Sequence, residues 1–104
     1  MKPNILILMS DEHRADVAGF AGDPVVRTPT LDWLAETGVA FDNAYTPSPI
    51  CVPSRQCILA GQYPKTCGCE GWIGLPHGHM TYPSRFGQVG YRTAAFGKLH
   101  MLGS

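Results

Sequence analysis

Three short clusters in this sequence hold side chains that could do chemistry together. Asp11 and Glu12 are adjacent carboxylates, the hard oxygen ligands that Ca²⁺ and Mg²⁺ prefer. Residues 51–55, Cys-Val-Pro-Ser-Arg, place a thiol and a guanidinium at the predicted start of a helix, where the unpaired N–H groups favour an anion. Lys98 and His100 add a cation and a proton donor. Together the three clusters would form a site for an anionic ester, with a nucleophile at position 51.

The predicted strands would position two of these clusters. Residues 4–9, Asn-Ile-Leu-Ile-Leu-Met, form an apolar run without alternation, which is typical of a strand buried on both faces of a parallel sheet. Further short strands are predicted at 39–44 and 91–96. Asp11 and Lys98 follow two of these strands closely, and ligands of open α/β sheets bind at the carboxyl ends of strands.

Helices are predicted between the strands from caps, glycine stops and apolar spacing. The first opens at Thr28 or Thr30 and ends at Gly38, the second covers residues 53–60, and the third covers residues 84–89. An order of strand, helix, strand, helix, helix, strand indicates an α/β fold with a mainly parallel sheet sandwiched by helices.

The composition excludes several classes of protein. The chain has 104 residues, so it is one domain or part of one. It is 44% hydrophobic and 15% charged, which is too apolar for a disordered segment. Eight basic and eight acidic residues give zero net charge, so we expect no nucleic acid and no membrane surface as a partner. Its longest apolar run is too short for a bilayer span or a signal peptide, and we expect a cytoplasmic location.

Residues 49–61 read Pro-Ile-Cys-Val-Pro-Ser-Arg-Gln-Cys-Ile-Leu-Ala-Gly. This stretch closely resembles the signature of the sulfatase family, whose core is Cys-x-Pro-x-Arg followed by an apolar pair and Thr-Gly or Ala-Gly. A second family signature, Gly-Tyr-x-Thr and then Gly-Lys-x-His, is similar to residues 90–93 and 97–100. Residues 3–12 look like the family's first strand and metal loop, so the resemblance runs from end to end.

The resemblance implies an alkaline-phosphatase-like α/β fold and an unusual nucleophile. Sulfatases convert the motif cysteine to Cα-formylglycine, so Cys51 would become an aldehyde that hydrates to a geminal diol. One hydroxyl, activated by a bound divalent cation, would attack the sulfur of a sulfate ester and displace the alcohol. Loss of the proton from the other hydroxyl would expel sulfate and restore the aldehyde.

The resemblance also implies a role for each matching residue. Asp11 would ligate Ca²⁺, or alternatively Mg²⁺, and Glu12 stands where many members have a second Asp. Cys51, as the diol, would be a further metal ligand, and Arg55 would orient and stabilise it. These assignments make the metal and the formylglycine the two implied cofactors.

Cationic side chains would bind the sulfate group. Lys98 would neutralise a sulfate oxygen, and His100 would contact the diol or the sulfate. His77, in a predicted loop over residues 62–81, would touch the substrate. These three are therefore the predicted substrate-binding residues.

Sulfatases are several times longer than this chain, and the rest of their metal site comes from a later segment. We therefore expect residues 1–104 to be the amino-terminal part of a sulfatase catalytic domain, with an incomplete sheet and little activity alone. The expected partners are a sulfate-ester substrate, the formylglycine-generating enzyme and the remainder of the sulfatase chain.

Three alternatives stay open at this point. One is a phosphate or phosphonate monoester hydrolase of the same superfamily, because the motif does not separate the two kinds of ester. Another is a zinc-binding module built on Cys67 and Cys69 with His77 and His79. The third is a non-catalytic segment that folds onto a partner.

Overall fold

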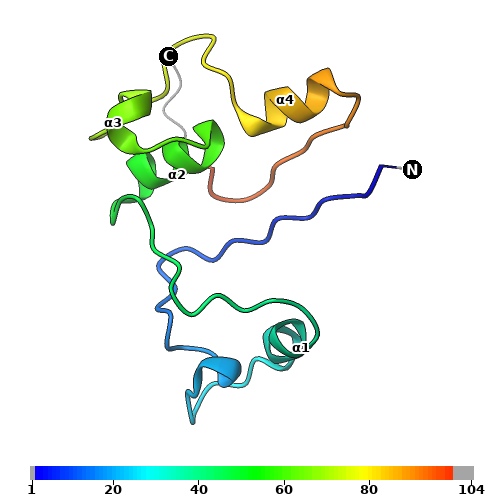
Figure 1. The fold of residues 1–104 in the computed structure, drawn as a ribbon. Helices are drawn as coiled ribbons and strands as arrows, with labels where there is room; N and C mark the ends of the chain where they lie inside the picture. The colour runs from blue at the N-terminus through cyan, green and yellow to red at the C-terminus, as the bar shows by residue number, and fades with distance from the viewer. Residues whose placement is uncertain (1, 100–104) are drawn as a thin grey trace. The chain divides into compact units, whose positions relative to one another are not determined.

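The structure is a computed structural model that describes residues 2–99. Within that range every regular element is helical, and extended and turn segments join the helices (Figure 1). The elements are the 3₁₀ helix η1 (Gly19–Ala21) and the α-helices α1 (Pro29–Thr37), α2 (Cys51–Ala60), α3 (Pro64–Cys67) and α4 (Tyr82–Gln88). None of these described helices combines the length and the apolar character that a bilayer crossing requires.

The chain divides into two compact units, residues 1–44 and residues 45–104. The first unit contains η1 and α1, and the second contains α2, α3 and α4.

The first unit is held by a polar network between η1 and α1. The Thr28 hydroxyl accepts a hydrogen bond from the backbone N–H of Gly19 at 2.8 Å and donates one to the Asp32 carboxylate at 2.8 Å. The same carboxylate accepts from the backbone N–H of Phe20 at 2.7 Å. Ala18 is the one buried residue in the described part of this unit. The first unit therefore depends on hydrogen bonds more than on an apolar core.

The second unit has a small core, which forms where α2 contacts α3 and α4. Val52 and Pro53 in the first turn of α2 are fully buried, and three cysteines form a separate buried cluster, against which Ala60 and Leu75 pack. Proline is tolerated in that first turn because its missing N–H would have no partner inside the helix. Gly61, with φ of 63°, ends α2 in the left-handed conformation that glycine adopts without strain.

The three predicted strands, residues 4–9, 39–44 and 91–96, are wrong for the chain as described, which contains no strand between residues 2 and 99. A strand needs a neighbour that satisfies its backbone hydrogen bonds, and parallel strands pair with segments distant in the sequence. Leu6, in the middle of the apolar run 4–9, is 81% exposed, so no neighbouring strand covers this run in the described residues. The described residues therefore contain helices of the predicted α/β fold but no sheet.

The predicted helices are confirmed, with small corrections. α1 follows Thr28, but the Thr28 side chain bonds to Gly19 and Asp32 instead of capping the helix. α4 begins two residues earlier than predicted, because the Thr81 hydroxyl accepts from the N–H of Ser84 and caps it. The one-turn helix α3 lies inside the predicted loop 62–81, where Pro64 supplies the first helical position.

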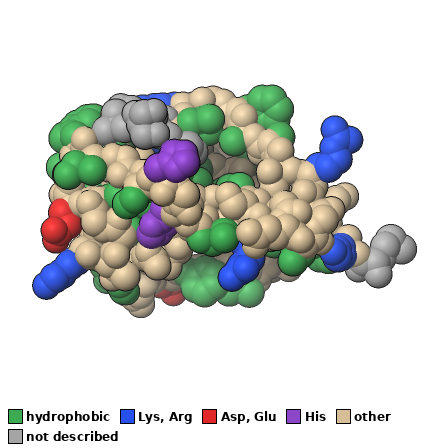
Figure 2. Space-filling model, turned by 90° about the horizontal axis from the view of Figure 1, so that it is seen from above, with side chains coloured by type: hydrophobic (Ala, Val, Ile, Leu, Met, Phe, Trp, Pro, Cys, Tyr) green, Lys and Arg blue, Asp and Glu red, His purple; other side chains and the backbone are tan. Residues whose placement is uncertain are grey.

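Hydrophobic side chains reach the surface at many points, and Figure 2 shows them in green over the visible face. They include the apolar run of the first unit, with Leu8 79% exposed. Proteins rarely leave large apolar patches open to water, and patches that are exposed usually mark an interaction surface.

Candidate active site

A short hydroxyl-rich segment leads the chain into α2 and fixes the start of the helix. The Thr46 hydroxyl donates to the backbone carbonyl of Ser48 at 2.7 Å and shares a hydrogen bond of 3.0 Å with the Ser54 hydroxyl. Ile50 is extended, with φ of −112° and ψ of 138°, and its carbonyl accepts from the N–H of Ser54 at 3.0 Å. These contacts place Cys51 as the first residue of α2.

Cys51 is a free, half-buried thiol at the positive end of a helix dipole. The N–H groups of Cys51 and Val52 have no partners inside the helix, so they can donate to an anion there, whereas Pro53 has no N–H and the N–H of Ser54 bonds to the Ile50 carbonyl. The other three cysteines of the chain are buried. Cys51 is therefore the thiol that a solvent-borne reagent or a modifying enzyme reaches most readily.

Arg55 joins the two segments that match the family signatures. It lies one turn after Cys51 on the same face of α2, because residues four apart are neighbours on a helix surface. Its Nη1 donates a hydrogen bond of 2.6 Å to the backbone carbonyl of Lys98, 43 residues away in the sequence. The structure thus joins Arg55 of the first segment to Lys98 of the second within the second unit.

The predicted substrate-binding histidines lie in different situations. His100 lies outside the described residues. His77 is exposed in the segment that follows α3. In the same segment, His79 Nε2 shares a hydrogen bond of 3.1 Å with the side-chain oxygen of Gln62, just after α2. This contact ties the loop to the end of α2, whereas the prediction for His77 itself stays a prediction.

Asp11 and Glu12 form a turn in the first unit, and both side chains are exposed. Glu12 has φ of 55°, and it is the non-glycine residue with positive φ in the described chain. A left-handed conformation costs an L-residue roughly 1–2 kcal/mol, and such strain concentrates at functional sites. Neighbouring Arg14 binds Asp16 through hydrogen bonds of 3.0 and 2.5 Å, which holds the pKa of Asp16 below its usual value.

The described residues supply part of a metal site at most. Among residues 2–99, no group of three or more His, Cys, Asp or Glu side chains is arranged to hold a metal ion. Two carboxylates offer at most four oxygens, whereas Ca²⁺ takes six to eight. The donor chemistry of Asp11 and Glu12 fits a hard divalent cation, but the set is incomplete. Cys51 belongs to the other unit, so its predicted part in the metal site stays a prediction.

The zinc alternative has no support in the described part of the chain. Cys67 and Cys69 are buried in the core of the second unit, whereas His77 is exposed and His79 is engaged with Gln62. A tetrahedral zinc site needs the cysteine and histidine ligands to converge on one point. The sequence alone did not reveal that these cysteines are core residues.

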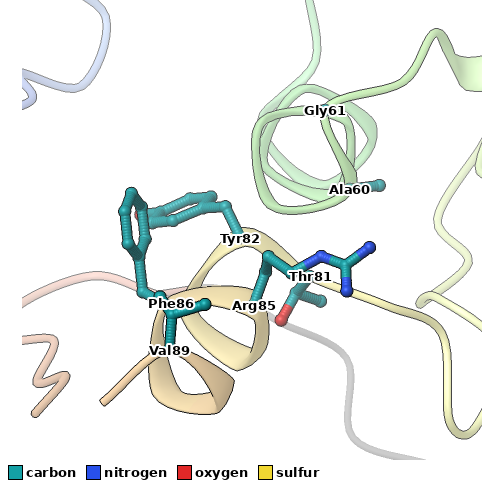
Figure 3. A pocket seen from close by; sticks show the side chains of 7 residues that line it. All are labelled: Ala60, Gly61, Thr81, Tyr82, Arg85, Phe86 and Val89. Atoms are coloured by element: carbon teal, nitrogen blue, oxygen red, sulfur yellow. The ribbon is translucent and has the colours of Figure 1, made fainter. Parts of the chain in front are cut away.

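A shallow hollow of about 340 Å³ lies between the end of α2 and α4 (Figure 3). Its lining consists of Ala60, Gly61, Thr81, Tyr82, Arg85, Phe86 and Val89. The rings of Tyr82 and Phe86 meet edge to face, with centroids 6.4 Å apart. The hollow lies at the opposite end of α2 from Cys51, roughly 13 Å along the helix axis. It is therefore separate from the chemistry of the first turn.

Sequence reasoning missed the residues that fix Cys51 at the start of α2. Thr46 and Ser54 hold the entry to α2, and Gln62 holds the loop through His79. The Thr-Pro-Ser-Pro run before Ile50 was a usable signal, because threonine and serine hydroxyls bind nearby backbone in turns. The Gln62 contact had no such signal, since it joins residues 17 apart through exposed side chains.

Comparisons with known proteins identify the family of the chain. The protein-family model described as Sulfatase matches residues 3–103. Over 103 residues the chain is 42% identical to an ulvan-active sulfatase of Formosa agariphila, covering 98% of this chain and 20% of that protein. It is 41% identical over 103 residues to an arylsulfatase of Clostridium perfringens, covering 97% and 21%. It is 33% identical over 112 residues to the human steryl-sulfatase, covering 96% and 19%.

The chain thus spans about a fifth of the length of the curated relatives it matches. No solved structure matches it.

Proposed function

The chain belongs to the sulfatase family, and from that premise we propose that its protein hydrolyses sulfate esters at a site built around the first turn of α2. Membership implies an alkaline-phosphatase-like α/β fold, of which the described residues contain helices and no strand. One observation supports the proposal above the others. The hydrogen bond from Arg55 to the Lys98 carbonyl joins the two segments whose residue types suit an anionic ester.

The chain's own residues would bind and orient the sulfate group. Arg55 contributes a planar guanidinium with several donors, which suits an oxyanion better than a point charge does. Lys98, whose backbone carbonyl accepts from Arg55, would add a second positive charge, and the N–H groups of Cys51 and Val52 would add donors at the start of α2. In a partly desolvated site these donors favour the extra negative charge that develops during ester cleavage.

We propose that Cys51 is the residue converted to Cα-formylglycine by a maturing enzyme. When formed, this group supplies an oxygen nucleophile that releases sulfate without an external hydrolytic step, which a plain thiol does not offer. The fit is favourable, because Cys51 is partly exposed at the start of a helix while the other cysteines are buried.

A divalent cation, Ca²⁺ or Mg²⁺, is the second group that the family implies. Asp11 and Glu12 would hold it together with ligands outside the described residues, and it would offset negative charge on the ester. The strained backbone at Glu12 supports a functional role for this turn.

The test uses the full-length protein and two variants. Cys51→Ala should abolish hydrolysis of an aryl sulfate, and Arg55→Ala should lower kcat/KM by about 10²–10³-fold, the usual loss of one donor to a developing oxyanion. Arg85→Ala, which removes an exposed arginine of α4, is the matched control and should keep full activity. Parallel rates on an aryl phosphate decide between the two kinds of ester.

Two outcomes would contradict the proposal. If Cys51→Ala still hydrolysed the aryl sulfate, Cys51 would be excluded as the source of the nucleophile. Faster hydrolysis of the aryl phosphate would favour the alternative phosphate or phosphonate monoester hydrolase. The mass of the tryptic peptide 28–55 reports the modification independently, because a thiol and an aldehyde differ in mass.

A further inference from the structure

Three thiols that the proposed chemistry does not use meet where α2 packs against α3. Cys57 lies on α2, Cys67 is the last residue of α3, and Cys69 follows Gly68, which ends α3. They are 3%, 3% and 0% exposed, and Ala60 and Leu75 pack against them. All three are free thiols. The cluster therefore brings together sulfur atoms from two different elements.

Hydrogen bonds order the cluster around Cys67. The Cys67 thiol donates to the carbonyl of Pro64 at 3.7 Å and lies in one buried cluster with both other thiols. The Cys69 thiol donates to the carbonyl of Cys67 at 3.6 Å. The three sulfurs do not form a group arranged to hold a metal ion. Their arrangement instead suits covalent pairing between two of them.

We propose that Cys57 and Cys67 form a disulfide when the protein meets a small-molecule disulfide such as glutathione disulfide, and that this bond links α2 to α3. Both S–H bonds break and one S–S bond forms between the proteins' sulfurs. The S–S bond of glutathione disulfide breaks and accepts the two electrons and two protons, leaving as two glutathione thiols.

Chain geometry selects Cys57 over Cys69 as the partner of Cys67. A disulfide needs its two Cα atoms roughly 4.4–6.8 Å apart with the Cβ atoms facing each other. Cys57 and Cys67 come from two helices that pack against each other and share one buried cluster, so a bond between them closes no small ring. Cys67 and Cys69 have one residue between them, so a bond there would close a small, strained ring.

The reaction is expected to be slow, because the cluster is buried. Burial raises the pKa of the Cys57 thiol, and burial raises that of Cys69 to about 11, so few thiolates are present near neutral pH. Wherever Cys51 is still a thiol and has not become formylglycine, it is partly exposed and should therefore react first. Once formed, the bond would hold α3 against the helix that carries Cys51 and Arg55, and it would raise the melting temperature of the second unit by several degrees.

Trypsin separates the cysteines in a way that makes the test direct. Cleavage after Arg55, Lys65 and Arg85 places Cys57 in peptide 56–65 and both Cys67 and Cys69 in peptide 66–85. The native full-length protein is incubated with glutathione disulfide, alkylated and digested without reductant. The expected product is peptide 56–65 linked to peptide 66–85, with the mass of two hydrogens lost.

Variants identify the two sulfurs. The linked peptides should persist in Cys69→Ser and disappear in Cys67→Ser and in Cys57→Ser. Cys67→Ala repeats the test with an apolar side chain in case serine disturbs the buried site. Linkage that survives loss of Cys67, an internal bond within peptide 66–85, or glutathione found on Cys51 alone would each overturn the proposal.

Discussion

The two units of this chain differ in what stabilises them. In residues 2–44 the fixed contacts are hydrogen bonds around Asp32, and the apolar run 5–9 is open to solvent. In residues 45–99, helix α2 buries Val52, Pro53 and Cys57 against its neighbours. The second unit therefore has a small buried core of its own. The first is held by hydrogen bonds around Asp32, which we call its polar frame, and its apolar run is not buried.

This difference follows from the distance between partners along the chain. Helices α2 and α3 are separated by a few residues, so their contacts close short loops at a small cost in entropy. A parallel strand, as predicted from the sequence for residues 4–9, pairs only after a long crossover. The helical unit can therefore form from local sequence, while the strand depends on partners far away.

The largest effect is expected at Leu6, which is 81% exposed. In the 104-residue chain Leu6→Ala should change the free energy of unfolding by less than about 0.5 kcal/mol, as exposed substitutions do. In the full-length sulfatase, where we expect residues 4–9 to be a central strand, the same change should cost about 2–5 kcal/mol. Urea unfolding of both proteins measures the difference.

Val25→Ala is the matched control, because Val25 is 83% exposed but lies in a loop outside the apolar run. It should be nearly neutral in both chain lengths. An equal cost of Leu6→Ala in the two chains would mean that residues 4–9 do not form a buried strand.

A smaller effect is expected from the polar frame of the first unit. Asp32→Ala removes the acceptor of the Phe20 N–H and the Thr28 hydroxyl, and it should destabilise this unit by about 1–2 kcal/mol. Hydrogen exchange at the Phe20 amide is the direct readout and should become faster. Asp32→Asn keeps an oxygen acceptor and should lose less, while Glu36→Ala on the same helix should leave that amide unchanged.

The smallest expected effect is the change of stability with pH. The second unit should lose stability as the pH rises, whereas the first should lose it as the pH falls. The Cys69 thiol has its pKa raised from 9.0 to about 11, mainly by burial. Its folded-state pKa is above the unfolded value, so its contribution to stability is complete below pH 9.0 and is lost as the pH rises toward about 11.

The first unit should respond at the acid end. Hydrogen bonds from the backbone N–H groups of Val26 and Val25 lower the pKa of Asp23, so its contribution is present above pH 3.8 and is lost as the pH falls further. Trp33 lies in the first unit and Trp72 in the second. The fluorescence of Trp72→Phe therefore reports the first unit, and that of Trp33→Phe reports the second. Identical pH profiles for the two tryptophans would contradict this separation.

Sequence reasoning recovered the helices because their signals are local. Thr28 before α1 and the glycines after α1 and α2 mark boundaries that need no distant partner. The strands were also read from a local pattern, but a strand exists only with neighbours that this chain does not supply within residues 2–99. α3 was missed because one turn is too short to show periodicity.

The site was predictable to the extent that residue types identify it. Cys51, Arg55 and Lys98 were named from sequence, and the structure joins the last two by a hydrogen bond. The roles of Asp11 and Glu12 stay predictions, since a metal site depends on several segments at once. The left-handed backbone of Glu12 was not predictable, because glutamate has no preference for that conformation.

The Arg55–Lys98 hydrogen bond has a consequence for how such enzymes diversify. It fastens both ends of an intervening stretch that includes residues 62–81, so that stretch behaves as a tethered loop. Doubling the length of a flexible loop costs only about 0.6 kcal/mol in closure entropy. Insertions or grafts there should therefore alter the surface around α2 while the Arg55–Lys98 contact stays in register, which makes this stretch a natural place to add residues without disturbing the first turn of the helix.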